Sequence, residues 1–244
     1  MTRFGESNQG GSQAGGRGAT QLERRMLSLQ RRLVREATMA TAMLERSLEA
    51  LLNLDEVIEH EVRSRDDRVD AEEVAIEVEC FSILTLEHPY ARDFRMIAFV
   101  LKTNADVERV ADHACSIAKL ASRIEGPSEW PRAVRELAQR VPVACHKLLR
   151  AVVDQDVDAA RELVRADKTI DRLDKRLYEE AVEMMGKEPT ERMHRNGLYL
   201  YRAGRELERV GDLVANIAED IVFLATGEII RHTIKKNKPG REAS

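Results

Sequence analysis

Apolar residues recur at steps of three and four positions through most of this chain, which is the period of an amphipathic α-helix. The clearest run begins behind a capping-box sequence, Thr20-Gln-Leu-Glu23, and continues past Ile58 and Val62 without an internal Gly or Pro. The pattern predicts a first helix of about forty residues, roughly 60 Å long. Because so long a helix needs partners along its whole length, we expect a helical bundle.

Five further helices are predicted by the same periodicity and by the positions of Pro and Gly. The fourth should be kinked at Pro142, and the fifth has a candidate break near Asp167. A proline-bounded turn, Gly126-Pro-Ser-Glu-Trp-Pro131, divides the six helices into two groups of three. The predicted ranges, all approximate, are 66–87, 90–125, 131–154, 157–185 and 190–234.

The two halves of the chain repeat one another at a spacing of about one hundred residues. Asp106-Val-Glu-Arg-Val-Ala-Asp112 matches Glu206-Leu-Glu-Arg-Val-Gly-Asp212. Asp66-Asp-Arg-Val-Asp70 similarly matches Asp167-Lys-Thr-Ile-Asp171. Several features that share one spacing indicate a tandem duplication of a three-helix unit.

The predicted fold is therefore all-α, with two tandem pseudo-symmetric three-helix bundles made of long helices. We place the first repeat at residues 20–126 and the second at residues 131–234. Residues 1–19 hold six of the thirteen glycines and are interpreted as a flexible tail. Residues 235–244 form a basic tail.

Each repeated stretch places a Glu and an Asp four positions apart: Glu108 with Asp112, and Glu208 with Asp212. On a helix this spacing puts both carboxylates on one face. A helical projection places the first pair in a sector that earlier turns fill with apolar residues, so we expect partial burial. Partly buried carboxylates must be protonated, paired with a cation or bound to a metal. Facing helices that each supply carboxylate oxygens are suited to hard metal ions.

The alternative interpretation of these acids is an ion-pair network that uses Arg109 and Arg209, each next to a motif Glu. The spacing alone leaves both possibilities open. Asp106 and Glu206 are expected outside the site, in weak ion pairs on the surface. We also expect one polar face of the third helix to meet solvent; its residues are Arg95, Lys102, Arg109 and His113.

Three glycines of the last predicted helix, Gly197, Gly204 and Gly211, recur every seven residues on one stripe. Each costs a helix up to ~1 kcal/mol relative to Ala. Their register predicts close packing against another element, within the bundle or across a dimer.

Composition excludes several classes of function. With 39 basic and 43 acidic residues and a formal net charge of −4, the chain has no global attraction for nucleic acid, and it carries no nucleic-acid-binding motif. Its three cysteines show no CxxC spacing, which favours reduced thiols and a cytoplasmic protein. There is no signal-peptide core and no apolar run long enough to span a bilayer, so we expect a membrane to matter only through partners.

We predict no enzymatic activity, because no nucleophile, base and acid group together and no glycine-rich phosphate loop is present. One Glu191-Arg-Met-His194 has the spacing found in carboxylate-bridged di-iron bundles. Such bundles need that spacing on two helices, and here it occurs once.

Several stretches together resemble the PhoU family of bacterial phosphate regulators. They are Glu87-His-Pro-Tyr-Ala-Arg-Asp-Phe-Arg95, Glu108-Arg-Val-Ala-Asp-His-Ala114 and Glu208-Arg-Val-Gly-Asp-Leu-Val214. The resemblance covers residues 20–234. It implies that the ExxxD positions bind multinuclear iron or zinc clusters, as some members do. The ligands implied here are Glu108, Asp112, Glu208 and Asp212, supplemented by Asp70 and Asp171.

The same resemblance implies a negative regulator of phosphate uptake and of the phosphate-starvation response. Such a protein acts as a cytoplasmic adaptor between a high-affinity phosphate ABC transporter, through its ATPase subunit, and a sensor histidine kinase. Some members are homodimers, and we expect the same here. The competing hypotheses are a carboxylate-bridged metal-binding, storage or metalloenzyme bundle, and a structural protein whose acids form only salt bridges.

Overall fold

The computed structural model describes residues 20–55, 57–125 and 130–230. Within those residues it contains six α-helices and no strand, which confirms the all-α prediction. The helices are α1 (Gln21–Asn53), α2 (Val57–Glu87), α3 (Ala91–Ala121), α4 (Arg132–Asp154), α5 (Val157–Lys187) and α6 (Glu191–Thr226).

Helix starts follow the capping signals in the sequence. The Thr20 hydroxyl accepts a hydrogen bond from the backbone N–H of Glu23, while the Glu23 carboxylate accepts one from the N–H of Thr20. Asp156 and Thr190 cap α5 and α6 in the same way through their side chains. These bonds satisfy backbone donors that the first turn of a helix otherwise leaves unpaired.

The prediction of one forty-residue first helix was wrong. The helix ends at Asn53, where Leu54 adopts a left-handed conformation (φ 55°) and its N–H bonds back to the carbonyl of Ala50. The next helix then begins at Val57 rather than near residue 66. Apolar periodicity runs unbroken across the turn, and Leu is uncommon in this conformation, so no residue type marked the boundary.

Other boundaries also differ from the predicted ones. Helix α5 passes Asp167 without the break considered there, whereas α4 keeps its predicted range with Pro142 inside it. Helix α6 ends at Thr226, where Gly227 takes a left-handed φ of 78°, eight residues before the predicted end. The predicted tails, residues 1–19 and 235–244, lie outside the described residues.

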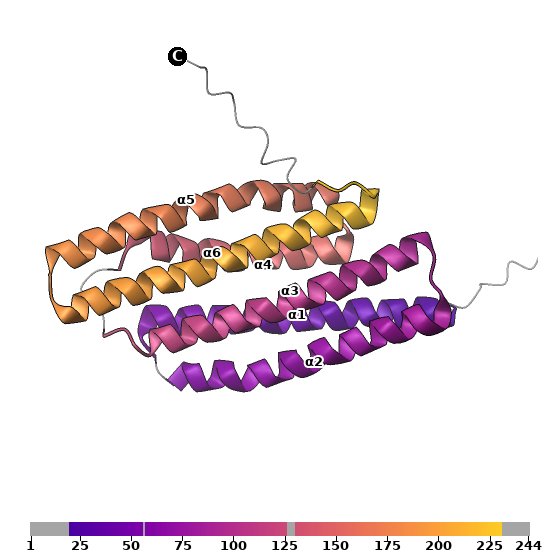
Figure 1. The fold of residues 1–244 in the computed structure, drawn as a ribbon, viewed down its shortest axis with the longest axis horizontal. Coiled ribbons are helices and arrows are strands. Elements are labelled where there is room, and N and C mark those ends of the chain that lie inside the picture. The colour runs from indigo at the N-terminus through magenta and orange to yellow at the C-terminus, as the bar shows by residue number, and fades with distance from the viewer. Residues whose placement is uncertain (1–19, 56, 126–129, 231–244) are drawn as a thin grey trace, which may run out of the picture.

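The six helices form two groups of three that lie side by side (Figure 1). Helices α1–α3 make one group and α4–α6 the other, and α3 packs against α6 where the groups meet. Helix α1 also contacts α4 across this boundary. One hydrophobic core runs through both groups, so the repeats share their interior.

One face of α3 is a buried seam of small residues. Its members are at most 3% exposed and are Val107, Ala111, Ala114, Ala118 and Ala121. The glycine stripe of α6 is also explained by close packing. A Cβ on Gly197 would lie 2.7 Å from Met185 Cγ, and one on Gly204 would overlap Leu177. These neighbours are side chains of α5, so the stripe serves packing within the second repeat.

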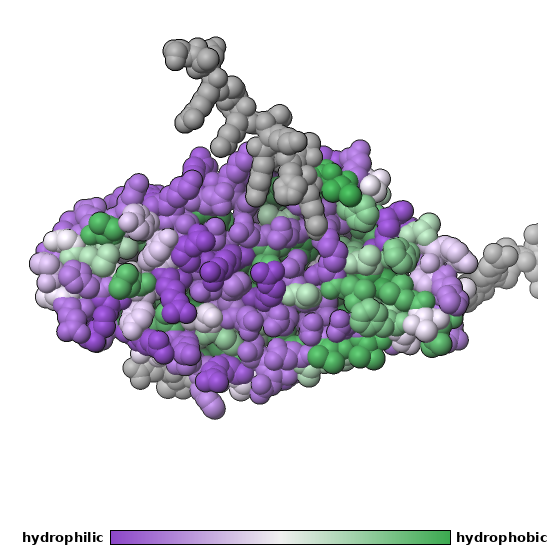
Figure 2. Space-filling model, viewed as in Figure 1, coloured by the Kyte–Doolittle hydropathy of each residue, from purple (hydrophilic) through white to green (hydrophobic). Residues whose placement is uncertain are grey.

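Helix α2 has an outward apolar face. Val74, Val78 and Phe81 are all more than half exposed. Figure 2 shows apolar surface gathered toward the end of the molecule where α2 ends and α3 begins. None of the described helices combines the length and apolar content needed to cross a bilayer.

Candidate metal centre: two unequal carboxylate clusters

Each repeat gathers carboxylates from its second and third helices. In the first repeat, α2 and α3 supply what we call the first cluster, and in the second repeat α5 and α6 supply the second cluster. All six carboxylates predicted as ligands lie in these two clusters. The first cluster is Asp66, Asp70, Glu73, Glu108 and Asp112; the second is Asp167, Asp171, Asp174, Glu208 and Asp212.

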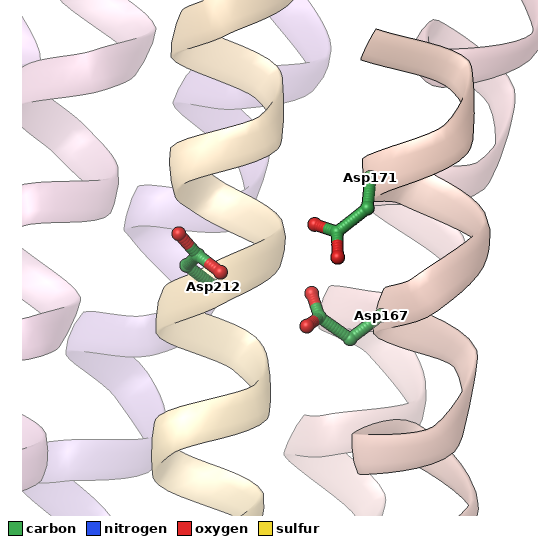
Figure 3. A group of neighbouring side chains, drawn as sticks. All are labelled: Asp167, Asp171 and Asp212. Atoms are coloured by element: carbon green, nitrogen blue, oxygen red, sulfur yellow. The ribbon is translucent and has the colours of Figure 1, made fainter. Parts of the chain in front are cut away.

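Three carboxylates of the second cluster converge on one point. Asp167 and Asp171 extend from α5 and Asp212 from α6, with a ligand oxygen of each within 4.8 Å of the others (Figure 3). Among the described residues this is the only such group of acidic, His or Cys side chains. Asp167 was missing from the predicted ligands, although its position four residues before Asp171 on one helix face was a usable signal.

An arginine that the sequence did not single out neutralises the inner part of the second cluster. Arg205 Nη1 lies 3.0 Å from Asp174 Oδ2 and 3.1 Å from Glu208 Oε1. Burial raises the pKa of Glu208; Arg205 opposes that rise, and Asp212 and Asp174 add to it. The ion-pair hypothesis was therefore right about an arginine but wrong about its position, because Arg209 instead lies 3.3 Å from Glu206.

The first cluster lacks that arginine. Position 105, which corresponds to 205, is Ala, and no described basic side chain lies within 4.0 Å of the carboxylates of Glu73 or Glu108. Burial raises the pKa of Glu108, and the charges of Asp112 and Asp70 raise it further. The first cluster therefore carries uncompensated negative charge.

A further carboxylate, Glu36 of α1, is buried behind the first cluster. It is 0% exposed, and neither of its carboxylate oxygens has a hydrogen-bond partner among the described residues. Burial raises its pKa to about 8, with contributions from Glu72, Glu73 and Glu108. Glu36 was not among the predicted ligands, although its position three residues after Leu33 on the apolar stripe was a visible signal.

The burial predicted for the ExxxD pairs is half correct. Glu108 and Glu208 are partly buried, but Asp112 and Asp212 are exposed. A helical projection gives the direction of a side chain and not how far the neighbouring helix covers it. Each pair therefore spans from the bundle interior to its surface, with the Asp at the solvent end.

The predicted solvent face of the third helix is only partly correct: Lys102 and Arg109 are exposed, but Lys102 and the partly buried His113 contact α6. His113 Nδ1 lies 2.8 Å from a carboxylate oxygen of Glu206, and these side chains are 14% and 7% exposed. Lys102 Nζ lies 2.6 Å from Asp220 of α6. The hydrogen bond from His113 lowers the pKa of Glu206. Glu206 is thus a buried contact between repeats and not a surface ion pair.

The chemistry of this donor set is that of cation binding. Its described members are all carboxylates. Carboxylate oxygens bind hard cations more readily than soft metal ions, which prefer thiolate ligands. Burial, together with the neighbouring Asp66, raises the pKa of Cys115 to about 12, so this thiol stays protonated near neutral pH. The residues therefore fit a metal ion held by oxygen, most clearly at Asp167, Asp171 and Asp212.

Comparisons with known proteins agree with the duplicated fold. The PhoU domain model matches residues 33–121 and 134–221. The phosphate-specific transport system accessory protein PhoU homolog of Deinococcus radiodurans is 34% identical over 187 residues, 76% of this chain and 87% of that protein. The protein of the same description from Pseudomonas aeruginosa is 34% identical over 189 residues, covering 76% and 77%.

Two solved structures share the fold. The crystal structure of PhoU from Pseudomonas aeruginosa superposes with a TM-score of 0.80 at 30% identity, covering 85% of this chain and all of that one. The phosphate transport system regulatory protein PhoU from Streptococcus pneumoniae has a TM-score of 0.77 at 23% identity, covering 86% and 99%. At that identity the second structure supports the fold alone.

Proposed function

The chain belongs to the PhoU family, and from that membership we propose that it is a negative regulator of phosphate uptake and of the phosphate-starvation response. In this proposal it is a cytoplasmic adaptor between a phosphate ABC transporter, contacted through its ATPase subunit, and a sensor histidine kinase. It acts by binding and not by catalysis. The observation that carries the proposal is the PhoU domain present twice, each copy with its own ExxxD motif.

The regulatory role is tested by deleting the gene in its host and measuring phosphate-starvation transcripts in phosphate-rich medium. The expected result is strong derepression that the full-length gene reverses. Unchanged transcript levels in the deletion strain would reject the role. Partner choice is tested separately by co-purification with the transporter ATPase subunit and with the cytoplasmic part of the kinase, using each partner alone as the control.

We propose that metal ions bind at the carboxylate clusters and link the second helix of each repeat to the third. Candidate ions are those of iron or zinc, in multinuclear clusters. Asp167, Asp171 and Asp212 would hold the metal of the second repeat, and Asp70 and Asp112 would contribute to that of the first. Bound metal would supply positive charge to acids that otherwise repel one another.

The metal proposal is tested by quantifying metals in protein purified without a metal-binding tag. The matched variant combines Asp112→Asn with Asp212→Asn, which removes charge but keeps side-chain size. We expect bound metal in the unmodified protein and a marked loss in the variant. Equal metal content in the two proteins would reject these ligands and leave the regulatory role untouched.

The second candidate function is a metal-storage or carboxylate-bridged metalloenzyme bundle, which the converging aspartates of the second repeat favour. It predicts oxygen-dependent turnover or large metal loads in iron-loaded protein. We also propose that the chain forms a homodimer, which light scattering on the purified protein tests directly. A monomer mass at all accessible concentrations would reject the dimer.

A further inference from the structure

Helix α2 carries apolar residues on two opposite faces. Its inner face lies in the core, where the fully buried residues are Ile76, Cys80 and Ile83. Its outer face carries Val74 and Val78, which are 55% and 62% exposed. A helix that is apolar all round is normally covered all round. The outer face of α2 therefore has the composition of a contact surface, although no other described helix covers it.

The outer apolar residues follow the spacing of a helix–helix seam. Val74, Val78 and Phe81 stand at steps of four and three residues, and the exposed Ala71 and Thr85 continue the same steps in both directions. We call these five residues the α2 seam; it is about 21 Å long. Steps of three and four along one line are the pattern that packs lengthwise against a second helix.

Apolar surface continues from the α2 seam around the turn into α3 (Figure 2). The large apolar residues exposed there are Leu86, Tyr90 and Phe94. Contiguous apolar surface with a polar border is typical of a binding site for another protein. The seam and the turn together therefore form one extended surface.

The second repeat shows that the fold does not require this seam. At a spacing of 101 residues, Ile76 corresponds to Leu177, and both are fully buried, so the two helices are in register. The residues of α5 that correspond to Val74, Val78 and Phe81 are Lys175, Glu179 and Val182. Lys175 and Glu179 are exposed charges, as expected of a solvent face. The apolar residues of α2 therefore need an explanation other than folding.

The charges on the two sides of the α2 seam differ. On the side toward α1, Arg32 Nε lies 2.8 Å from a carboxylate oxygen of Glu72, and Arg25 Nε lies 2.9 Å from one of Glu79.

On the side toward α3, Asp70 and Glu77 border the seam. Neither has a basic side chain of the described residues within 4.0 Å. A helix that covers the seam would therefore be attracted by Lys or Arg along this edge.

Two other occupants fit these charges less well. If α2 paired with α2 of a second copy, Glu77 would face its own copy in an antiparallel arrangement and Ser82 in a parallel one, so it would meet no base. An anionic lipid surface would be repelled by the same acids. The homodimer proposed above would accordingly use another surface.

We propose that the α2 seam is a docking surface for an amphipathic helix of a partner protein, with apolar residues at steps of three and four and Lys or Arg along the edge that meets Glu77. The inference rests on the proposed adaptor role and gives that role a contact surface. Apolar contacts along the seam supply affinity, and the acidic edge selects the partner and its orientation.

The test uses two synthetic helical peptides with Leu at the seam positions, one with Lys on both edges and one with Glu. Fluorescence anisotropy measures their binding to the purified full-length chain. Val78→Glu puts a charge in the middle of the seam, and Glu77→Lys reverses the charge of its border. Val182→Glu is the matched control, because it changes an exposed apolar residue of α5.

The Lys peptide should bind at least about tenfold more tightly than the Glu peptide, a difference of about 1.4 kcal/mol. Val78→Glu should weaken binding of the Lys peptide at least about tenfold. General attraction between opposite charges predicts the reverse, because this variant is more acidic. Glu77→Lys should reduce the preference for the Lys peptide, and Val182→Glu should change neither affinity.

Equal affinities for the two peptides, or binding that Val78→Glu leaves unchanged, would overturn the proposal. So would light scattering that shows Val78→Glu converting a dimer to a monomer, because a second copy would then cover the seam. Binding to phosphatidylcholine–phosphatidylglycerol vesicles that Val78→Glu abolishes would overturn it in favour of lipid. If Val78→Glu fails to fold by circular dichroism, Glu77→Lys still decides.

The host distinguishes this proposal from the regulatory role. In the deletion strain, the Val182→Glu gene should restore repression of the phosphate-starvation transcripts, and the Val78→Glu gene should not. Full repression by Val78→Glu would overturn the docking surface and leave the regulatory role intact. Absence of derepression in the deletion strain itself would reject the regulatory role.

Discussion

In the second repeat, Arg205 bridges Asp174 and Glu208, whereas in the first repeat position 105 is Ala and no basic side chain of the described residues pairs with Glu73 or Glu108. The repeated motifs are nearly identical in sequence, yet their surroundings differ. The sequence of the carboxylate motif therefore does not determine how the negative charge of its acids is compensated. Residues outside the motif, on the same helix or on a neighbouring one, decide whether each acid is paired, protonated or available to a metal.

The two clusters also differ in how their acids are arranged between surface and interior. The aspartates of the second cluster converge within 4.8 Å, while its inner acids are held by Arg205. The described acids of the first cluster do not converge in this way, but the charge of Glu108 acts on the buried Glu36 of α1. The second repeat has its converging carboxylates near the surface, whereas the first repeat has its most buried carboxylate, Glu36, in the interior.

The largest effect should come from Glu36→Gln, which should reduce the pH dependence of the free energy of unfolding. The folded pKa of Glu36, about 8, is above its unfolded value. Its contribution to stability is therefore full below the unfolded pKa and is lost as pH rises toward 8. In chelator, the unmodified chain should lose roughly 4 kcal/mol through this group between about pH 5 and pH 8.

Urea unfolding at several pH values measures this loss, and Glu36→Gln should flatten the curve. The control is Glu179→Gln, which changes an exposed acid of α5 and should leave the curve unchanged. Parallel curves for Glu36→Gln and the unmodified chain would contradict the assigned pKa.

Removal of the built-in cation should be the next largest effect. Arg205→Ala leaves the buried Asp174 and the partly buried Glu208 without this cation, so the free energy of unfolding should fall by about 2 kcal/mol, a value reduced because Arg205 is partly exposed. Ala105→Arg should do the reverse in the first repeat and stabilise the metal-free chain. Chemical unfolding in chelator measures both, and a destabilised Ala105→Arg variant would show that the repeats are not equivalent at this position.

The contact between repeats should have a moderate effect. His113→Ala leaves the buried Glu206 with only Arg209, and should cost about 1–2 kcal/mol. The corresponding residue of the second repeat is Leu213, so this contact exists on one side only. A double-mutant cycle with Glu206→Gln isolates the pair. Strict additivity of the two substitutions would mean that His113 and Glu206 do not interact.

The smallest effect should come from the glycine stripe of α6. Gly204→Ala would force its Cβ into the fully buried Leu177, and the overpacking should outweigh the gain in helix propensity by about 1 kcal/mol. Gly186→Ala is the matched control: its Cβ would meet nothing within 4 Å, so it should stabilise by roughly 0.5–1 kcal/mol. Equal effects in thermal melts would show that α5 can shift to make room.

Much of the architecture was predictable because it depends on local pattern. The helical period, the capping residues Thr20 and Thr190, and the hundred-residue spacing led to an all-α duplicated fold, which the structure confirms. The turn at Leu54 was not predictable, since neither Gly nor Pro marks it. The ligand assignments at the ExxxD positions remain predictions.

By itself, the sequence determined the helices, the duplication and the spacing of the motif acids, because each depends on residues close together in the chain. Only the tertiary structure decided which charges meet: Arg205 with Asp174 and His113 with Glu206, while Glu36 has no hydrogen-bond partner in the part of the chain that the structure describes. The physical reason is that burial and ion pairing depend on distances between helices. A periodic pattern shows which way a side chain points, but not what lies there.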